Sequence, residues 1–437
     1  MYLQELNKAN QTTSSGIAFL DKVREKGLER LADAEFPTNR TEDWRQVDLR
    51  PLTRNTFTHP AEGHSVTRDS LSAYLMEECV NSTIVFVNGR FDASLSDVSG
   101  LPEGVEVARF ADLTEKHAEI AGKWLTKAAQ YENDPFVPFN AAQLQDGVFV
   151  HVKKEINSEV PIHILNVNTS DQEDFFTTPR TLIVAERHSD ITIVEDFVGL
   201  GKNRYFTGSV TESILGDESH ITHVKIQRDS KNAIHISRTA AYQGRGSNYN
   251  SYTISIGAAL FRNEPKALVD AENAHATLDG LVMVTDDQVS DTHSVMDHLK
   301  ANCTSHQLHK VVALGNGKSV FNGKIFVRQD SQKIDAFQEN RNLLLSQDAE
   351  VFTKPQLEIF ADDVKCSHGA TIGQLSQDEM FYLMSRGLSR EASMEILTYG
   401  YALEVIENLP LKSVRDQLEK KISELTRPSE TTAHIPG

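Results

Sequence analysis

A regular repeat runs through the middle of the chain and restricts the possible folds more than any other feature. Short β-rich runs recur there with turn residues between them. Five of them can be aligned at nearly equal steps, and they begin at Ser189, Ser219, Asn248, Ala276 and Ser305. Later runs at Ser331 and Leu357 follow at a shorter step. A fixed period in the range of roughly 20–50 residues is typical of solenoids, propellers and arrays.

The length of the repeat selects among these architectures. A four-stranded propeller blade needs about 40–45 residues, which is longer than the observed period. One coil of a parallel β-helix fits the period, and each coil buries its inner face by stacking on its neighbours. We therefore predict a parallel β-helix over residues 147–374, with a large antiparallel sandwich as the alternative.

Helical patterns flank the repeat, so the fold class is mainly β with α. Residues 1–146 read as a mostly helical domain, with helices expected near residues 17–36 and over 111–129 and a strand at 82–87 before a tight turn. The helical periodicity of residues 375–426 predicts three helices, and the first begins at the capping box Ser376–Glu379. These helices could cap one end of the β-helix or present a face to a partner. Residues 427–437 are expected to form a disordered tail.

The net charge and the cysteine content limit the classes of partner and the cellular compartment that fit this chain. Lys and Arg number 44 against 62 Asp and Glu, and a net charge of −18 argues against nucleic-acid and membrane-surface partners. Cys79, Cys303 and Cys366 lie too far apart for a disulfide framework and fit a reducing compartment. The first residues lack a secretory signal pattern, and no window approaches the length of about 18 apolar residues that spans a bilayer. We expect a soluble cytoplasmic protein.

The segment LEIFADDVKCSHG, residues 357–369, carries the strongest candidate ligands. Cys366 and His368 are two positions apart, so in a strand they point to the same side. A thiolate and an imidazole suit iron, zinc or copper. Two ligands do not complete a metal site, so the pair predicts a shared or transient site that something else completes. The alternative is a buried thiol beside a surface imidazole.

A second group of metal-type residues is less convincing. It comprises His293, His298, Cys303, His306 and His309. In strands, separations of three and five place side chains on opposite faces, so these histidines cannot converge on one ion. We expect polar residues on the exterior of the β-helix or in its turns, and Cys303 as a small buried residue.

Two further motifs suggest enzymes but fit poorly. The segment GNGKS at 315–319 lacks the first glycine of a phosphate loop and precedes a strand, so we expect a turn and no ATP site in this chain. Asp362 and Asp363 could act as general acid and base in a carbohydrate-active β-helix lyase or hydrolase. A solvated turn is the commoner role for such a pair.

Three segments resemble the SufB/SufD family of iron–sulfur cluster assembly proteins. They are residues 357–393, residues 321–346 and the stretch FPTNRTEDWRQVDL at 36–49, so the similarity spans most of the chain. The sequence KCSHGAT at 365–371 resembles the SufD branch of that family. The cysteine-rich pattern of the SufB branch is not present.

The resemblance implies a fold and a role. The fold would be a right-handed parallel β-helix between an N-terminal helical region and C-terminal helices. The protein would be a non-catalytic scaffold subunit that pairs with a SufB-like paralogue through the β-helix and binds a SufC-like ABC ATPase through its C-terminal helices. His368, and less firmly Cys366, would then contribute half of a site for transient iron or a nascent cluster, shared with the SufB-like partner. A homodimer of the isolated chain and a structural adaptor without metal chemistry are the remaining alternatives.

Overall fold

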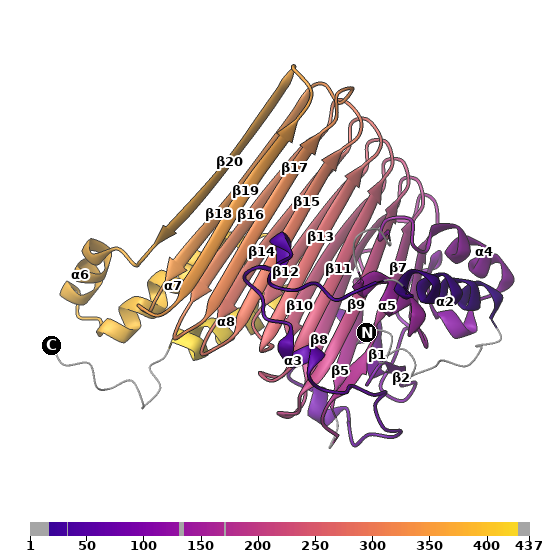
Figure 1. Cartoon of the computed structure of the whole chain (residues 1–437), viewed down its shortest axis with the longest axis horizontal. Coiled ribbons are helices and arrows are strands. Elements are labelled where there is room, and N and C mark those ends of the chain that lie inside the picture. The colour runs from indigo at the N-terminus through magenta and orange to yellow at the C-terminus, as the bar shows by residue number, and fades with distance from the viewer. Residues whose placement is uncertain (1–16, 33, 131–134, 170–171, 427–437) are drawn as a thin grey trace.

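The computed structural model describes residues 17–32, 34–130, 135–169 and 172–426, and its centre is a solenoid of two facing β-sheets (Figure 1). The first sheet contains, in spatial order, β2 (Arg90–Phe91), β1 (Thr83–Val87), β5 (Ile162–Asn168), β8 (Asp190–Gly199), β10 (His220–Arg228), β12 (Asn248–Ser255), β14 (His275–Val284), β16 (Thr304–Ala313), β18 (Ile334–Leu344) and β20 (Val364–Gly373). The second contains β19 (Glu350–Ile359), β17 (Lys318–Val327), β15 (Val289–His298), β13 (Leu260–Val269), β11 (Ile234–Gln243), β9 (Tyr205–Leu215), β7 (Arg180–Ala185), β4 (Val148–Val152) and β3 (Val105–Arg109), with β6 (Phe175–Thr177) beside β9.

From β7 to β20, successive strands alternate between the two sheets, so each coil adds one strand to each sheet. Neighbouring strands pair in parallel throughout the repeat, and the antiparallel pairs are β1–β2 and β3–β4 in the N-terminal region. The prediction of a parallel β-helix is confirmed, and the antiparallel sandwich is wrong.

The five aligned runs begin within one residue of β8, β10, β12, β14 and β16, which all belong to the first sheet. The shorter step expected for the runs at Ser331 and Leu357 was a wrong interpretation. Ser331 lies before the start of β18. The run at Leu357 belongs to β19 in the second sheet, and the next strand of the first sheet is β20. Since β18 begins at Ile334 and β20 at Val364, the last coil keeps nearly the same length as the coils before it.

A left-handed residue marks the corner before most strands of the first sheet. The positive φ values lie between 56° and 63°, at His188, Glu218, Gly246, Asn273, Asn302 and Lys333. Glycine and asparagine adopt this conformation readily, whereas longer side chains meet a steric penalty there. The recurrence of one corner conformation explains how coils of nearly equal length stay in register.

The N-terminal helices cover the outer face of the second sheet (Figure 1). They are α2 (Ala18–Leu31), α4 (Glu115–Trp124) and α5 (Phe136–Ala142), with the single-turn α3 (Arg50–Thr53) further along. Helix α4 is shorter than the expected 111–129, because Thr114 caps its start and Leu125 leaves the helical conformation. The predicted strand at 82–87 and its turn are confirmed as β1, followed by the left-handed pair Asn88-Gly89.

The C-terminal helices are α6 (Gln377–Ser385), α7 (Arg390–Ile406) and α8 (Lys412–Thr426). The capping box is confirmed in that the Ser376 hydroxyl accepts a hydrogen bond from the Glu379 amide. Helices α7 and α8 pack on the outer face of the first sheet, where Ala402, Ile406 and Leu418 join one apolar cluster with strand residues. Helices α7 and α8 therefore cover a face of the solenoid and do not cap its end. Residues 427–437, expected to be disordered, lie outside the described residues.

The two ends of the solenoid differ. Strands β2, β3 and β4 close the end beside the N-terminal helices, whereas β19 and β20 are the final strands of the two sheets at the other end (Figure 1). In the described part of the chain, no helix is both long and apolar enough to cross a membrane.

Candidate metal half-site at the open end of the solenoid

Cys366 and His368 both lie on β20, the last strand of the first sheet. Their register partners on β18 are Ala336 and Gln338, which are buried between the two sheets. Since side chains alternate along a strand and keep their side across a register pair, both candidate ligands face the interior of the final coil. The expectation that they share one side of a strand is confirmed.

Cys366 and His368 each lie at the end of a different row of interior side chains. Cys366 continues a mainly apolar row of Tyr249, Ala276, Ser305 and Ala336, and it packs against the main apolar core. His368 continues a polar row formed by Gln307 and Gln338. The interior side chains beside β20 therefore form two rows, a mainly apolar row that ends at Cys366 and a polar row that ends at His368.

The polar row contains buried groups that lack partners. The side-chain amides of Gln307 and Gln338 are fully buried and, within the described residues, make no hydrogen bond. A buried amide left in this state is unfavourable by about 1–3 kcal/mol. Gly323 on the facing strand β17 provides the space for Gln338, because a Cβ there would collide with its amide nitrogen. The polar row thus leads from the core to the exposed imidazole of His368.

The two candidate ligands differ in accessibility. His368 is exposed, whereas Cys366 is half-buried. Burial, and secondarily the carboxylate of Asp335, raises the pKa of the Cys366 thiol above its ordinary value. A thiol must lose its proton to bind a metal, so the raised pKa makes Cys366 the less available ligand of the two.

Comparison with known proteins agrees with this fold. Residues 167–401 match the model described as "SUF system FeS cluster assembly, SufBD core domain", and residues 2–164 match the "SufBD protein N-terminal region". The chain belongs to the SufBD family. An iron–sulfur cluster assembly SufBD family protein of Synechocystis is 32% identical over 96% of this chain and 94% of its own length. The iron–sulfur cluster assembly proteins SufD of Escherichia coli and Bacillus subtilis are 30% and 25% identical, over 91% and 95% of this chain and the same shares of their own lengths.

Membership of the SufBD family makes this chain an iron–sulfur cluster assembly protein. The metal chemistry of that family fits the ligand types found on β20. It gives no support to a carbohydrate-active site at Asp362 and Asp363. Both are exposed at the bend between β19 and β20, where the main chain of Asp363 bonds to Lys333 and Gln332.

The second group of histidines is dispersed, as its spacing predicted. His293 and His306 face outward beside Asp291 and Asp279, whereas His298 and His309 face the interior. The expectation of exterior or turn positions was therefore wrong for His298 and His309, because alternation along a strand sends every second residue into the core. Burial lowers the pKa of His298 to about 4 and that of His309 to about 3. Cys303 is buried, as expected.

The GNGKS segment is a turn between β16 and β17, as predicted, with Gly315 in the left-handed region. Lys318 begins β17, and its ammonium group lies near Gln46 and Glu350.

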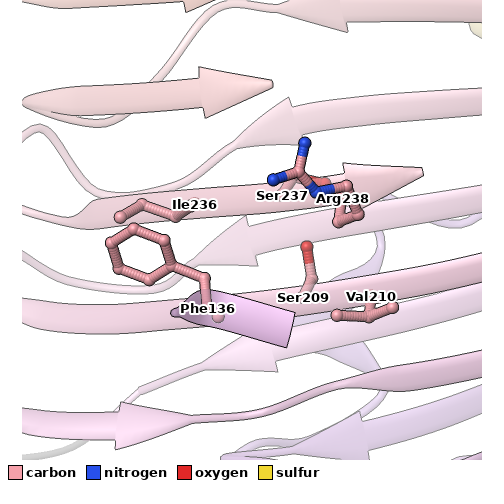
Figure 2. Close-up of a pocket in the computed structure, with 7 residues that line it drawn as sticks. Phe136, Ser209, Val210, Ile236, Ser237 and Arg238 are labelled. Carbon is pink, nitrogen blue, oxygen red and sulfur yellow. The ribbon is translucent and has the colours of Figure 1, made fainter. Parts of the chain in front are cut away.

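Sequence reasoning missed a buried serine–histidine–aspartate network in this SufBD protein. His235 lies 2.8 Å from the Ser209 hydroxyl through Nε2 and 2.8 Å from the Asp229 carboxylate through Nδ1. These are the contacts of a hydrolase triad, but all three side chains are buried. The nearby cavity in Figure 2, beside Phe136 and the β9–β11 pair, measures about 10 Å³, which is the space of a single water. The network therefore satisfies polar groups in the interior and leaves no room for a substrate.

Proposed function

We propose that this chain is the SufD-like subunit of a SufBCD-type scaffold, which acts in iron acquisition and nascent cluster formation at the interface with a SufB-like partner. The observation that carries the proposal is the position of His368 and Cys366. They lie on the final strand of the first sheet and face the interior of an end coil that the described residues leave without a further strand. A site of this kind is completed by a second chain.

The exposed edges support pairing with a second solenoid. β19 and β20 each contain ten residues, and each ends a sheet. A long unpaired edge is a template for strand addition. Ile359, Phe360 and Ile372 near these edges are 37%, 60% and 51% exposed. A SufB-like paralogue built from the same coils would extend both sheets and cover these apolar side chains. The same edges would allow a homodimer when the chain is isolated.

The proposed ligand chemistry follows from the geometry. His368 supplies an exposed imidazole, and Cys366 supplies a thiol that iron would have to deprotonate. The partner must provide the remaining ligands, because two ligands do not complete an iron or cluster site. The iron and the nascent cluster are cargo, which the complex passes on after assembly. We therefore propose His368 as the principal ligand and Cys366 as a secondary one.

The C-terminal helices supply the proposed surface for a SufC-like ATPase. Phe381, Tyr382 and Met384 on α6 are 75%, 57% and 45% exposed, and Ile396 on α7 is also exposed. Several large exposed apolar side chains on one short helix and its neighbour are typical of a protein–protein interface. ATP hydrolysis by that partner would rearrange the interface at β19 and β20.

We propose the cytoplasm as the compartment, since the three cysteines are free. We keep the domain division 1–146, 147–374 and 375–426 as a proposal.

Co-purification tests the proposal. The chain is co-expressed with a SufB-like and a SufC-like protein, and the complex is purified anaerobically for composition and visible absorption. The variant Ile372→Lys places a charge on the edge surface and is expected to lose the SufB-like partner and cluster absorption but to keep the SufC-like partner. Phe381→Glu is expected to lose only the SufC-like partner. The matched control Thr371→Lys alters the neighbouring exposed residue on the opposite face of β20.

A complex that keeps all three subunits and its absorption in the Ile372→Lys variant would contradict the proposed interface. Point variants are preferable to deletion of α7 and α8, because those helices bury an apolar face of the first sheet. Deleting them would expose that face and confuse partner loss with unfolding.

A further inference from the structure

A second set of imidazole and carboxylate groups lies at the opposite end of the solenoid from β20. Glu106 on β3 and His151 on β4 are register partners, and His117 lies in the first turns of α4. Among the residues that the structure describes, these three each bring one ligand atom to within 4.8 Å of the others. They come from three separate parts of the sequence, so no local sequence motif indicates them.

Two ring nitrogens converge on one carboxylate oxygen. His117 Nε2 lies 2.6 Å and His151 Nδ1 3.3 Å from Oε2 of Glu106. Lys153 holds the other oxygen, Oε1, at 2.6 Å. Although burial alone would raise the pKa of Glu106, hydrogen bonds from Lys153 and the two histidines lower it to about 2. The carboxylate is therefore ionised at neutral pH, and one of its oxygens points at both rings.

The buried ring of His151 lies between two carboxylates. Its Nε2 lies 2.9 Å from Glu186 Oε1, and its Nδ1 lies 3.3 Å from Glu106 Oε2. With Nε2 donating to Glu186, Nδ1 is the ring nitrogen that can offer a lone pair to a metal ion. An ion between Nδ1 and the Glu106 carboxylate would contact both ligand atoms. The His151 side chain is fully buried, so its position is fixed by the surrounding residues.

Glu186 gives His151 the environment of a metal ligand. Metal-binding histidines usually donate their second ring N–H to a carboxylate or carbonyl, which fixes the tautomer and orients the lone pair. Glu186 is itself held, because the amide of Lys154 donates to its Oε2 at 3.0 Å. Ring contacts with Phe149 fix both imidazoles, at centroid distances of 5.6 Å for His117 and 5.9 Å for His151.

We propose that Glu106, His117 and His151 bind a divalent first-row transition ion such as Fe²⁺ or Zn²⁺, with Glu186 positioning His151. Two imidazoles and one carboxylate are a set that both ions use, and such sites leave positions open for water. Ligand bonds of about 2.0–2.1 Å place neighbouring ligand atoms about 3.3 Å apart, so Glu106 Oε2 and His117 Nε2, now 2.6 Å apart, must separate by less than about 1 Å. Its side chain is 31% exposed and has the space to do so.

Cobalt titration of the full chain tests the site. The chain is freed of metal with a chelator and titrated anaerobically with Co²⁺, whose visible absorption reports protein ligands. We expect one tightly bound Co²⁺ per chain, displaced by added Zn²⁺ or Fe²⁺. Because protons compete with a metal ion for imidazole and carboxylate ligands, binding should weaken as the pH falls from 7.5 to 6. The Fe²⁺ and Zn²⁺ competition constants identify the preferred ion.

Three variants assign the ligands. His117→Ala and Glu106→Gln should each weaken Co²⁺ binding by more than about tenfold, and Glu186→Gln by about tenfold. The matched control His188→Ala removes a partly exposed histidine that also contacts a carboxylate, Glu218 at 3.2 Å, and should leave binding unchanged. Circular dichroism and thermal unfolding without metal verify that each variant is folded.

Absence of Co²⁺ and Zn²⁺ binding at pH 7.5 would overturn the proposal and leave the three side chains as a hydrogen-bonded group. Equal affinity in the wild type and in His117→Ala would overturn it as well. Neither result bears on the function proposed for His368, because the two groups lie at opposite ends of the sheets.

Discussion

His368 on β20 and Gln338 on β18 are register partners on adjacent parallel strands, and both face the interior of the solenoid. One is exposed and the other fully buried, so this pair marks where the closed core becomes an open surface. A polar row leading to an exposed imidazole contrasts with the neighbouring interior cluster, which is packed mainly with aliphatic side chains.

Replacing Gln338 with Met should stabilise the isolated chain. Its buried amide has no hydrogen-bond partner within the described residues, and a methionine of similar length removes the unpaired groups. We expect the free energy of unfolding to rise by about 1 kcal/mol, measured by urea denaturation. A decrease would show that the amide is satisfied by water and supports the fold.

Replacing Cys366 with Ser should reduce cluster formation less than replacing His368. The thiol is half-buried with a raised pKa, and its packing against the core accounts for its position. Iron and sulfide would be quantified in the reconstituted complex. If Cys366→Ser abolishes the cluster while the complex still assembles, the thiol is a primary ligand and our ranking of the two residues is wrong.

Acid should destabilise the chain through its buried histidines. The folded state keeps His309 and His298 neutral, with pKa values of about 3 and 4, whereas the unfolded chain binds protons below about 6.5. The free energy of unfolding therefore falls as the pH decreases from about 6.5 towards 4, by up to about 1.4 kcal/mol per pH unit for each ring.

The variant His309→Met isolates one of these rings. Urea unfolding at several pH values should give a shallower dependence on pH than in the wild type, while the difference between the two proteins stays constant above pH 7.5. Equal slopes between pH 6 and 4.5 would contradict a neutral His309 in the folded chain.

The period of the repeat was visible in the sequence because the apolar faces of β8 to β16 recur at nearly constant steps. The last coils were misread, since Leu357 lies in a strand of the facing sheet that looks much like its counterparts. The corner conformation could not be predicted either. Glycine or asparagine occurs at some corners, but His188, Glu218 and Lys333 adopt the same left-handed conformation without a residue type that indicates it.

The candidate half-site was predictable because its two residues lie within one strand, where alternation alone places them together. The Glu106–His117–His151 group and the Ser209–His235–Asp229 network were not, because their members are joined by tertiary packing of distant segments. Spacing arguments apply within an element. They do not apply between α4 and a sheet, or between strands that are separated by other strands in the sequence.

Cluster yield in the assembled complex tests the central claim most directly. His368→Ala is reconstituted anaerobically with the SufB-like and SufC-like partners, and iron and sulfide are counted per complex. The control is His220→Ala, which changes an exposed histidine at the start of β10. Since His368 is exposed, stability should change by less than about 0.5 kcal/mol, and assembly should be intact. We predict a severe loss of cluster for His368→Ala and wild-type yield for the control. A wild-type yield in His368→Ala would contradict the account.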